Sequence, residues 1–247
     1  MKTRVLLGPL LLLVIWSIVA TSGWISPLFL VPPWDVAMAL LRLGKTGAIF
    51  LDVGSTLYRL GVGLTTGIVL GIAIGIAVGY SQRLYSSLEV LIDFFRSVPV
   101  AALIPLFLLF FGIGDRAKMA TAGWATCLIV LVNTTYGVRN CRIARLMIAR
   151  TMKANWFQTL LKVVLPDSMP QIVAGVRTAL SIALIVVVAT EMLMGTKAGL
   201  GKRIFDSSMT YSIGDMYAAI LLTGALGYCM NKLFVMCERR LVHWSGR

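Results

Sequence analysis

The sequence is poor in charge: only 13% of its 247 residues are Asp, Glu, Lys or Arg, whereas soluble domains carry about 25%. Hydrophobic residues make up 58% of the chain. This balance excludes a disordered, collagenous or disulfide-stapled protein and makes a soluble enzyme unfavourable. The composition predicts an integral membrane protein.

Catalytic and metal-binding side chains are also scarce. The only histidine, His243, rules out a two-histidine metal site and an H-E-x-x-H motif. The four cysteines, Cys127, Cys141, Cys229 and Cys237, have no C-x-x-C spacing, so we expect buried free thiols. The sequence therefore predicts no metal site and no nucleophile–base pair, which disfavours a membrane-embedded enzyme.

A glycine-rich stretch, Gly195–Lys202, has a superficial likeness to a phosphate-binding loop. Its glycine spacing is one residue too long, and Arg203 stands where Ser or Thr should follow the lysine. A membrane helix, not a strand, is expected before it. We therefore predict that this chain binds no nucleotide or other cofactor of its own.

Long runs without any charge indicate membrane helices. Such runs lie between Arg4 and Asp35, Arg59 and Arg83, Arg96 and Asp115, and Lys118 and Arg139. About 20 apolar residues cross a bilayer as a helix, and no alternating strand pattern is visible. We predict an all-α fold with a single transmembrane domain over residues 1–247. Its six expected spans are 5–22, 57–80, 97–113, 118–137, 171–194 and 215–236.

The segments between these spans are expected to be an outer loop (23–56), a short basic loop (81–96), a turn (112–117), a long basic loop (138–170) and a last loop (195–214). The first span lacks an A-x-A cleavage site and is expected to be retained.

The charge distribution predicts the orientation. With the N-terminus inside, 15 of the 23 Lys and Arg residues fall on inner segments, which places both termini in the cytoplasm. The formal charge of +13 is then explained by cytoplasmic loops and contact with anionic lipid, without nucleic acid.

The second span carries a glycine at every fourth position. These five residues form one slowly drifting stripe on a helix, along which another backbone can approach closely. We call them the glycine ladder: Gly63, Gly67, Gly71, Gly75 and Gly79.

Inside the fifth span, Glu191 is costly in lipid. Two interpretations stay open: an interhelical pairing that fixes packing, or a place on a substrate path. Pro99 and Pro105 free backbone carbonyls in the third span and predict a bend, with or without a functional role.

The long inner loop contains a mixed polar and apolar stretch, Ile143–Val164, with apolar residues near helical spacing. We expect an amphipathic helix that ends at Leu165–Pro166, with Pro170 beginning the next span. Such a helix either lies on the inner leaflet or docks in a groove of a soluble partner.

The same loop resembles the EAA-type cytoplasmic loop of permease subunits in bacterial ABC importers, which has the form E-A-A-x-x-x-G followed about nine residues later by I-x-L-P. Residues 149–155 and 162–166 match its latter part. Met147 and Ile148 replace the first Glu and Ala, and Lys153 stands at the glycine position. Because lysine adopts glycine's backbone angles only at a cost, a bend at this position is not assured.

Other stretches resemble the sulfonate, taurine and nitrate branch of that family. These stretches are Ile25–Pro33, Phe95–Pro99 continuing to Gly114, Ala189–Leu193 followed by Gly199–Gly201, and the tail Arg239–Trp244. Together they cover nearly the whole chain in the right order, and the first and last are most similar to taurine permeases.

The resemblance implies a type I importer permease in the bacterial inner membrane. The implied partners are a second copy of the chain, two ATPase subunits that hold ATP and Mg, and a periplasmic or lipid-anchored binding protein. The residues that it assigns to coupling with the ATPase are Ala149, Arg150, Thr151, Met152, Lys153, Ala154, Asn155, Trp156, Phe157, Leu165 and Pro166.

The implied substrate is a small anion or zwitterion, with sulfonate or taurine favoured over nitrate and bicarbonate. Candidates for the pathway or gate are Pro99, Arg177, Glu191, Met192 and Gly195. A stand-alone secondary transporter or channel is the alternative, but it predicts inverted repeats, which are not visible.

Overall fold

The computed structural model describes residues 2–26, 28–141 and 143–241. Helices account for 86% of the residues, and no strand occurs in these ranges. His243 lies outside the described residues, as do Arg142 and the side chain of Arg150. In order, the helices are α1 (Lys2–Thr21), α2 (Pro33–Lys45), α3 (Ala48–Tyr80), α4 (Gln82–Ser97), η1 (Val100–Leu103), α5 (Ile104–Phe111), α6 (Asp115–Arg139), α7 (Ile143–Thr151), α8 (Trp156–Thr159), η2 (Leu160–Val164), α9 (Leu165–Leu193), α10 (Leu200–Met209) and α11 (Ile213–Leu241).

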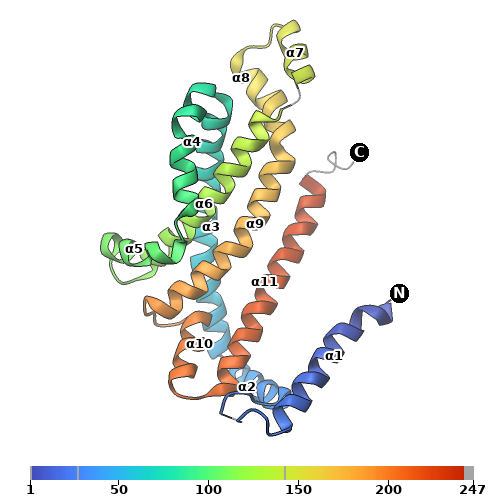
Figure 1. Ribbon diagram of the computed structural model, residues 1–247, viewed down its shortest axis with the longest axis vertical. Helices are drawn as coiled ribbons and strands as arrows, with labels where there is room; N and C mark the ends of the chain where they lie inside the picture. Colours follow the sequence, from blue (N-terminus) through green and yellow to red (C-terminus); the bar gives the residue numbers. More distant parts are fainter. Residues whose placement is uncertain (1, 27, 142, 242–247) are drawn as a thin grey trace.

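Three long helices, α3, α6 and α9, form the centre of the molecule (Figure 1). Small and branched side chains pack between them, including Leu60, Ala122, Ala183 and Val187, all of them fully or almost fully buried. Figure 1 shows α7 and α8 at one end and α2 and α10 at the other. Following the predicted orientation, we call these the inner and the outer end.

The glycine ladder lies directly against α6. A Cβ atom added at Gly67 would stand 2.5 Å from the carbonyl oxygen of Gly123, and one at Gly75 would stand 2.8 Å from that of Leu131. The partner residue advances by about four positions for each ladder glycine, so α3 and α6 run parallel in close backbone contact. Any larger side chain in this stripe would push the two helices apart.

The third predicted span is wrong as a single helix. Residues 97–113 contain the end of α4, then η1 and α5, and the chain bends by 90° between α4 and the η1–α5 segment. Pro99 lies at this break and lacks the N–H that would continue the helix. The expected basic loop 81–96 is also wrong, since it is the amphipathic helix α4, capped by the Ser81 hydroxyl.

The other predicted spans fall on α1, α3, α6, α9 and α11. In the described chain, three helices are long and apolar enough to cross a membrane: Ala48–Tyr80, Trp156–Leu193 and Ile213–Arg240. The bent pair of α4 with η1–α5 would make a fourth, and α1 provides a shorter apolar helix, Leu7–Thr21. The six spans therefore stay a prediction.

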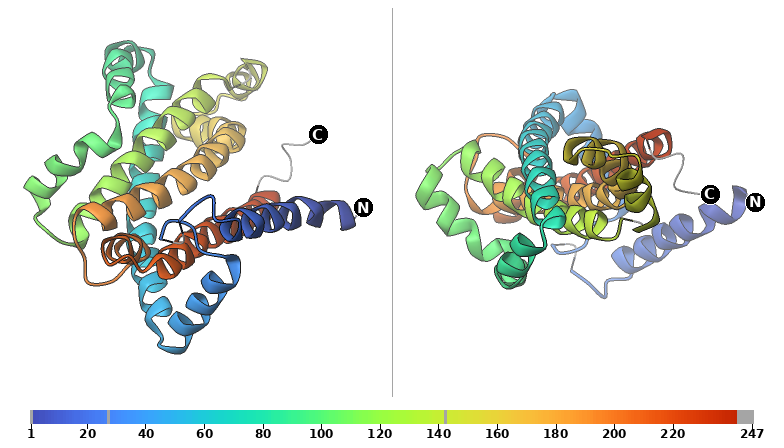
Figure 2. Two further views of the ribbon diagram at one scale, coloured as in Figure 1. Left: turned by 60° about the horizontal axis from the view of Figure 1, so that its bottom comes forward. Right: turned by 90° about the horizontal axis from the view of Figure 1, so that it is seen from above.

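Two predicted loops contain helices at the outer end. The loop 23–56 holds α2 and the first turns of α3, and the loop 195–214 holds α10. The first helix, α1, projects from the bundle in both views of Figure 2. Its C-terminal part is tied down by Trp16, whose indole N–H donates to the carbonyl oxygen of Val31 at 3.0 Å.

Candidate functional site

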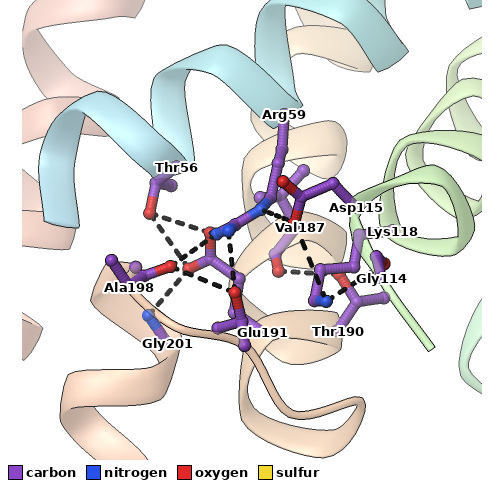
Figure 3. A network of polar contacts seen from close by, with 12 residues as sticks. Thr56, Arg59, Gly114, Asp115, Lys118, Val187, Thr190, Glu191, Ala198 and Gly201 are labelled. Carbon is purple, nitrogen blue, oxygen red and sulfur yellow. Dashed lines mark hydrogen bonds and ion pairs between the residues drawn. The ribbon is translucent and has the colours of Figure 1, made fainter. Parts of the chain in front are cut away.

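A cluster of buried charges lies at the outer end, where α3, α6, α9 and α10 meet (Figure 3). Its centre is Arg59, which is 4% exposed. The Arg59 guanidinium donates to Glu191 at 2.5 Å and to Asp115 at 2.8 Å. It also donates to the carbonyl oxygen of Ala198 at 2.8 Å and to the Thr196 hydroxyl at 2.7 Å. One arginine of α3 thus fixes α6, α9 and the loop after α9.

The Glu191 carboxylate is 1% exposed and is surrounded by donors from its own chain. Besides Arg59, it accepts from the Thr56 hydroxyl at 3.0 Å and from the backbone N–H of Gly201 at 2.9 Å. A Cβ atom at Gly201 would stand 2.2 Å from the carbonyl oxygen of Val188. Glycine is required here because α10 approaches α9 at backbone distance.

The glycine-rich stretch that is similar to a phosphate loop surrounds carboxylates of this chain. The backbone N–H of Gly199 donates to Asp52 at 2.9 Å, and that of Gly201 donates to Glu191. Asp52 also pairs with Arg203 of α10. These anions are therefore internal, and they hold the start of α10 against α3 through Asp52 and against α9 through Glu191.

Lys118 completes the cluster from α6 and is fully buried. Its ammonium group donates to the carbonyl oxygens of Gly195 at 2.9 Å and Gly114 at 3.1 Å, and lies 4.0 Å from Asp115. It therefore joins the turn before α6 to the loop after α9. We name six residues the ion-pair cluster: Asp52, Arg59, Asp115, Lys118, Glu191 and Arg203.

The ion-pair cluster has three cations and three anions, so its formal charge is zero. A buried pair is an uncertain source of net stability, but removing one partner strands a desolvated charge at a cost of about 3–5 kcal/mol. Glu191 of α9 pairs with Arg59 of α3, which agrees with the interhelical pairing that was one of the two interpretations of the sequence. Its partners Thr56 and Arg59, and the neighbouring Lys118, were missed as a site, although Arg59 and Lys118 both mark the outer limits of apolar runs.

The other pathway candidates are dispersed. Gly195 lies in the ion-pair cluster's loop with φ +60°, and Met192 packs on the hydrophobic core. Pro99 lies at the bend between α4 and η1. Arg177 contacts Asn231 at 3.2 Å and is 14 residues, or about 21 Å of helix, from Glu191. The structure does not bring Arg177 and Glu191 into one site.

The inner end consists of α7, a tight turn and α8. Lys153 occupies the turn with φ +52°, in the left-handed region. The N–H of Ala154 closes the turn by donating to the carbonyl oxygen of Ala149 at 3.0 Å. Asn155 then starts α8 with a capping box to Gln158. The bend is therefore present although the residue is lysine, whose left-handed backbone conformation costs about 1–2 kcal/mol.

Two predicted features of this segment are wrong. Ile143–Val164 is not one helix, because the turn at Lys153 divides it. Leu165–Pro166 does not end a helix, and Pro170 does not begin one, since the helical chain continues from Trp156 to Leu193. The π-helical turn η2 precedes Pro166 and widens the helix where the proline ring would meet a carbonyl one turn earlier.

Apolar side chains at the inner end face outward. Five of them are 58–76% exposed: Met147, Ile148, Met152, Trp156 and Phe157. Thr151, Lys153 and Asn155 are exposed as well, whereas Ala149 is buried and Leu165 and Pro166 are half-buried. An ion pair between Arg145 and Asp167 holds α7 to the start of α9. The α7–turn–α8 segment, which we call the inner hairpin, thus presents several large apolar side chains that the described part of the chain leaves exposed.

Most of the chain is similar to a known protein family. Residues 67–243 match the family described as the binding-protein-dependent transport system inner membrane component. The chain belongs to this family. It is therefore an inner membrane component of an ABC importer and a multi-pass membrane protein.

Relatives of this permease carry names for several solutes. The taurine transport system permease protein TauC of Escherichia coli is 30% identical over 95% of this chain and 87% of its own length. A protein named as an aliphatic sulfonates transport permease, SsuC, of Bacillus subtilis is 30% identical over 98% of this chain and 87% of its own. The bicarbonate transport system permease protein CmpB of Synechococcus elongatus is 29% identical over 95% and 87%.

Solved structures support the same fold. The inward-facing MetNI methionine ABC transporter aligns with a TM-score of 0.68 at 20% identity, over 81% of this chain and 97% of that chain. An amino acid ABC transporter aligns with a TM-score of 0.61 at 16% identity, over 83% and 97%. The type I importer permease fold implied by the resemblance is thereby confirmed.

Proposed function

We propose that this permease forms the solute pathway of an ATP-driven importer for a small sulfonate, taurine or a similar small anion or zwitterion. The observation that carries the coupling part of the proposal is the uncovered apolar surface of the inner hairpin, Met147 to Phe157. An amphipathic helix with exposed apolar anchors fits a groove of a soluble partner. The expected partner is an ATPase subunit that holds ATP and Mg.

The proposed assembly contains two copies of the permease, two ATPase subunits and a binding protein at the outer face, with both termini of the permease in the cytoplasm. ATP binding draws the two hairpins together, and the rigid helices transmit this motion to the outer end. To move a two-state equilibrium from 1:99 to 99:1, ATP must favour one state by about 5.5 kcal/mol.

Within this scheme the ion-pair cluster has a structural role at the outer gate. The Glu191 carboxylate is occupied by Thr56, Arg59 and Gly201, so it does not serve as a substrate contact. It keeps the outer ends of α3, α9 and α10 together while the assembly changes state.

The test is ATP hydrolysis by the permease reconstituted in lipid with its candidate ATPase and binding protein. Taurine, an alkanesulfonate, nitrate and bicarbonate are added in turn. Stimulation by one of them supports the importer and its substrate class. If the complex forms without stimulation, the substrate class is wrong. If no ATPase binds, the coupling role is wrong and a stand-alone secondary transporter takes its place.

A further inference from the structure

A cleft lined by apolar and charged side chains runs between α4 and α6, on the inner side of the ion-pair cluster. Two cavities of about 440 and 310 Å³ lie along it, and they share Arg96 and Val132 in their linings. The smaller cavity reaches Asn133 of α6 and Ile182 of α9. Because no residue of α4 is buried, this helix leaves its polar side chains open to the cleft.

Charges of both signs line the inner part of the cleft. Glu89, Asp93 and Arg96 come from α4, and Arg139 comes from the end of α6. The Arg139 guanidinium lies 3.6 Å from the ring centroid of Tyr85, whose hydroxyl donates to Glu89 at 2.8 Å. The Tyr85 side chain thus contacts one guanidinium at its ring face and one carboxylate at its hydroxyl.

The second pair is more accessible. Arg96 and Asp93 are 3.3 Å apart, with side chains that are 54% and 65% exposed. An exposed ion pair of this kind contributes little to the free energy of folding. Asp93 and Arg96 can therefore separate and each bind a charged group of a ligand. Two guanidinium groups and two carboxylates therefore share one cavity of about 440 Å³ with a formal charge of zero.

From this arrangement we infer that the cleft binds a small zwitterion, with its acid group at Arg96 and Arg139 and its ammonium group at Glu89 and Asp93. Guanidinium groups bind oxyanions through paired N–H donors. A plain anion would meet two carboxylates with nothing to neutralise them, whereas an amino acid or aminosulfonate offers its ammonium. The inference rests on the proposed function and restricts its substrate class from small anions and zwitterions to zwitterions.

The same chemistry occurs in a phospholipid headgroup, since phosphatidylethanolamine also joins an ammonium group to an acid group. The inference assigns the cleft to the free solute. The experiment therefore compares lipid compositions as well as solutes.

The experiment measures binding of radiolabelled taurine to the full-length permease in nanodiscs of phosphatidylglycerol, without the binding protein. Ethanesulfonate, which lacks the ammonium group, and ethylamine, which lacks the acid group, are the competitors. Because one charged hydrogen bond changes affinity by about tenfold or more, we expect both competitors to bind at least about tenfold more weakly than taurine.

Two variants assign the charges. We expect Asp93→Asn to weaken taurine binding about tenfold and to strengthen ethanesulfonate binding, because the sulfonate then meets one carboxylate fewer, whereas Arg96→Gln should weaken both. Arg240→Gln, an exposed arginine at the end of α11, is the matched control and should change neither.

Equal affinities for taurine and ethanesulfonate, or an Asp93→Asn variant with unchanged taurine binding, would overturn the inference. Loss of taurine binding in nanodiscs that contain phosphatidylethanolamine would assign the cleft to the headgroup and overturn it as well. If a solute stimulates the importer but this binding pattern is absent, the proposed function stands and zwitterion binding in the cleft is wrong. If the binding pattern is present but no ATPase associates, zwitterion binding in the cleft stands and the proposed function is wrong.

Discussion

The outer and inner ends of the permease handle their polar and apolar groups in opposite ways. At the outer end, the charges of Arg59, Lys118 and Glu191 are buried and satisfied within the chain. At the inner end, Met152, Trp156 and other apolar groups are exposed. The outer end is therefore built to keep helices together, and the inner end to meet something outside the chain.

The backbone shows the same contrast. Glycines at Gly199 and Gly201 let α10 touch α9 at the outer end, where larger residues would collide. At the inner end, Lys153 accepts a left-handed conformation that glycine would adopt freely. Substitutions at the outer end should act on folding, and substitutions at the inner hairpin should act on coupling.

The largest effect is expected for Arg59→Met, which leaves the buried Glu191 carboxylate without its guanidinium partner and also removes the pair with the half-exposed Asp115. We expect the free energy of unfolding to fall by about 3–5 kcal/mol. Steric trapping in nanodiscs measures this change.

The matched control is Arg42→Gln, because Arg42 is 66% exposed and pairs with Asp215. Its loss should cost at most about 1 kcal/mol. Similar losses for the two variants would show that burial does not distinguish them. If Glu191→Gln kept full assembly and transport, the gate role of Glu191 would be wrong.

A smaller effect is expected in the glycine ladder. Gly67→Ala places a Cβ atom 2.5 Å from the Gly123 carbonyl oxygen and should cost about 1–3 kcal/mol of folding free energy. Gly61→Ala on the same helix has nothing within 4 Å and should instead stabilise α3 by about 0.5–1 kcal/mol. Thermal unfolding midpoints of the two variants should move in opposite directions, and a shared direction would contradict close α3–α6 packing.

Lys153→Gly removes the cost of the left-handed lysine, partly offset by the greater freedom of glycine in the unfolded chain. We expect the turn to be stabilised by about 0.5–1 kcal/mol, seen as slower hydrogen exchange at Ala154. Lys162→Gly is the control, since it places glycine inside a helical turn and should speed exchange there. Unchanged exchange at Ala154 would show that the lysine is not strained.

The smallest effect on folding is expected for Phe157→Ala, because this side chain is 58% exposed. The free energy of unfolding should change by less than about 0.5 kcal/mol, while ATP hydrolysis stimulated by solute should be lost. Leu193→Ala, another exposed apolar residue far from the hairpin, should leave hydrolysis unchanged. Normal solute-stimulated ATP hydrolysis with Phe157→Ala would show that the exposed Phe157 side chain is not needed for coupling to the ATPase.

Local sequence determined much of this protein. The long apolar runs specified helices because a charge-free run of this length is stable only across lipid or in a core. The four-residue glycine period specified a close helix neighbour because it repeats almost once per helical turn. The EAA-type loop and the segments around Pro99 and Glu191 indicated the family before any fold was known.

Tertiary structure decided what local pattern could not. Arg59 and Glu191 are 132 residues apart, and only the packing of α3 against α9 makes them partners. Two prolines act in opposite ways: the helix breaks at Pro99 but continues through Pro166. The difference is that the turn before Pro166 is widened into a π-helical turn, which makes room for the proline ring. Local sequence thus indicated the long apolar helices but not α2, α4 and α10, and how the helices meet depends on buried charges whose partners come from several helices at once.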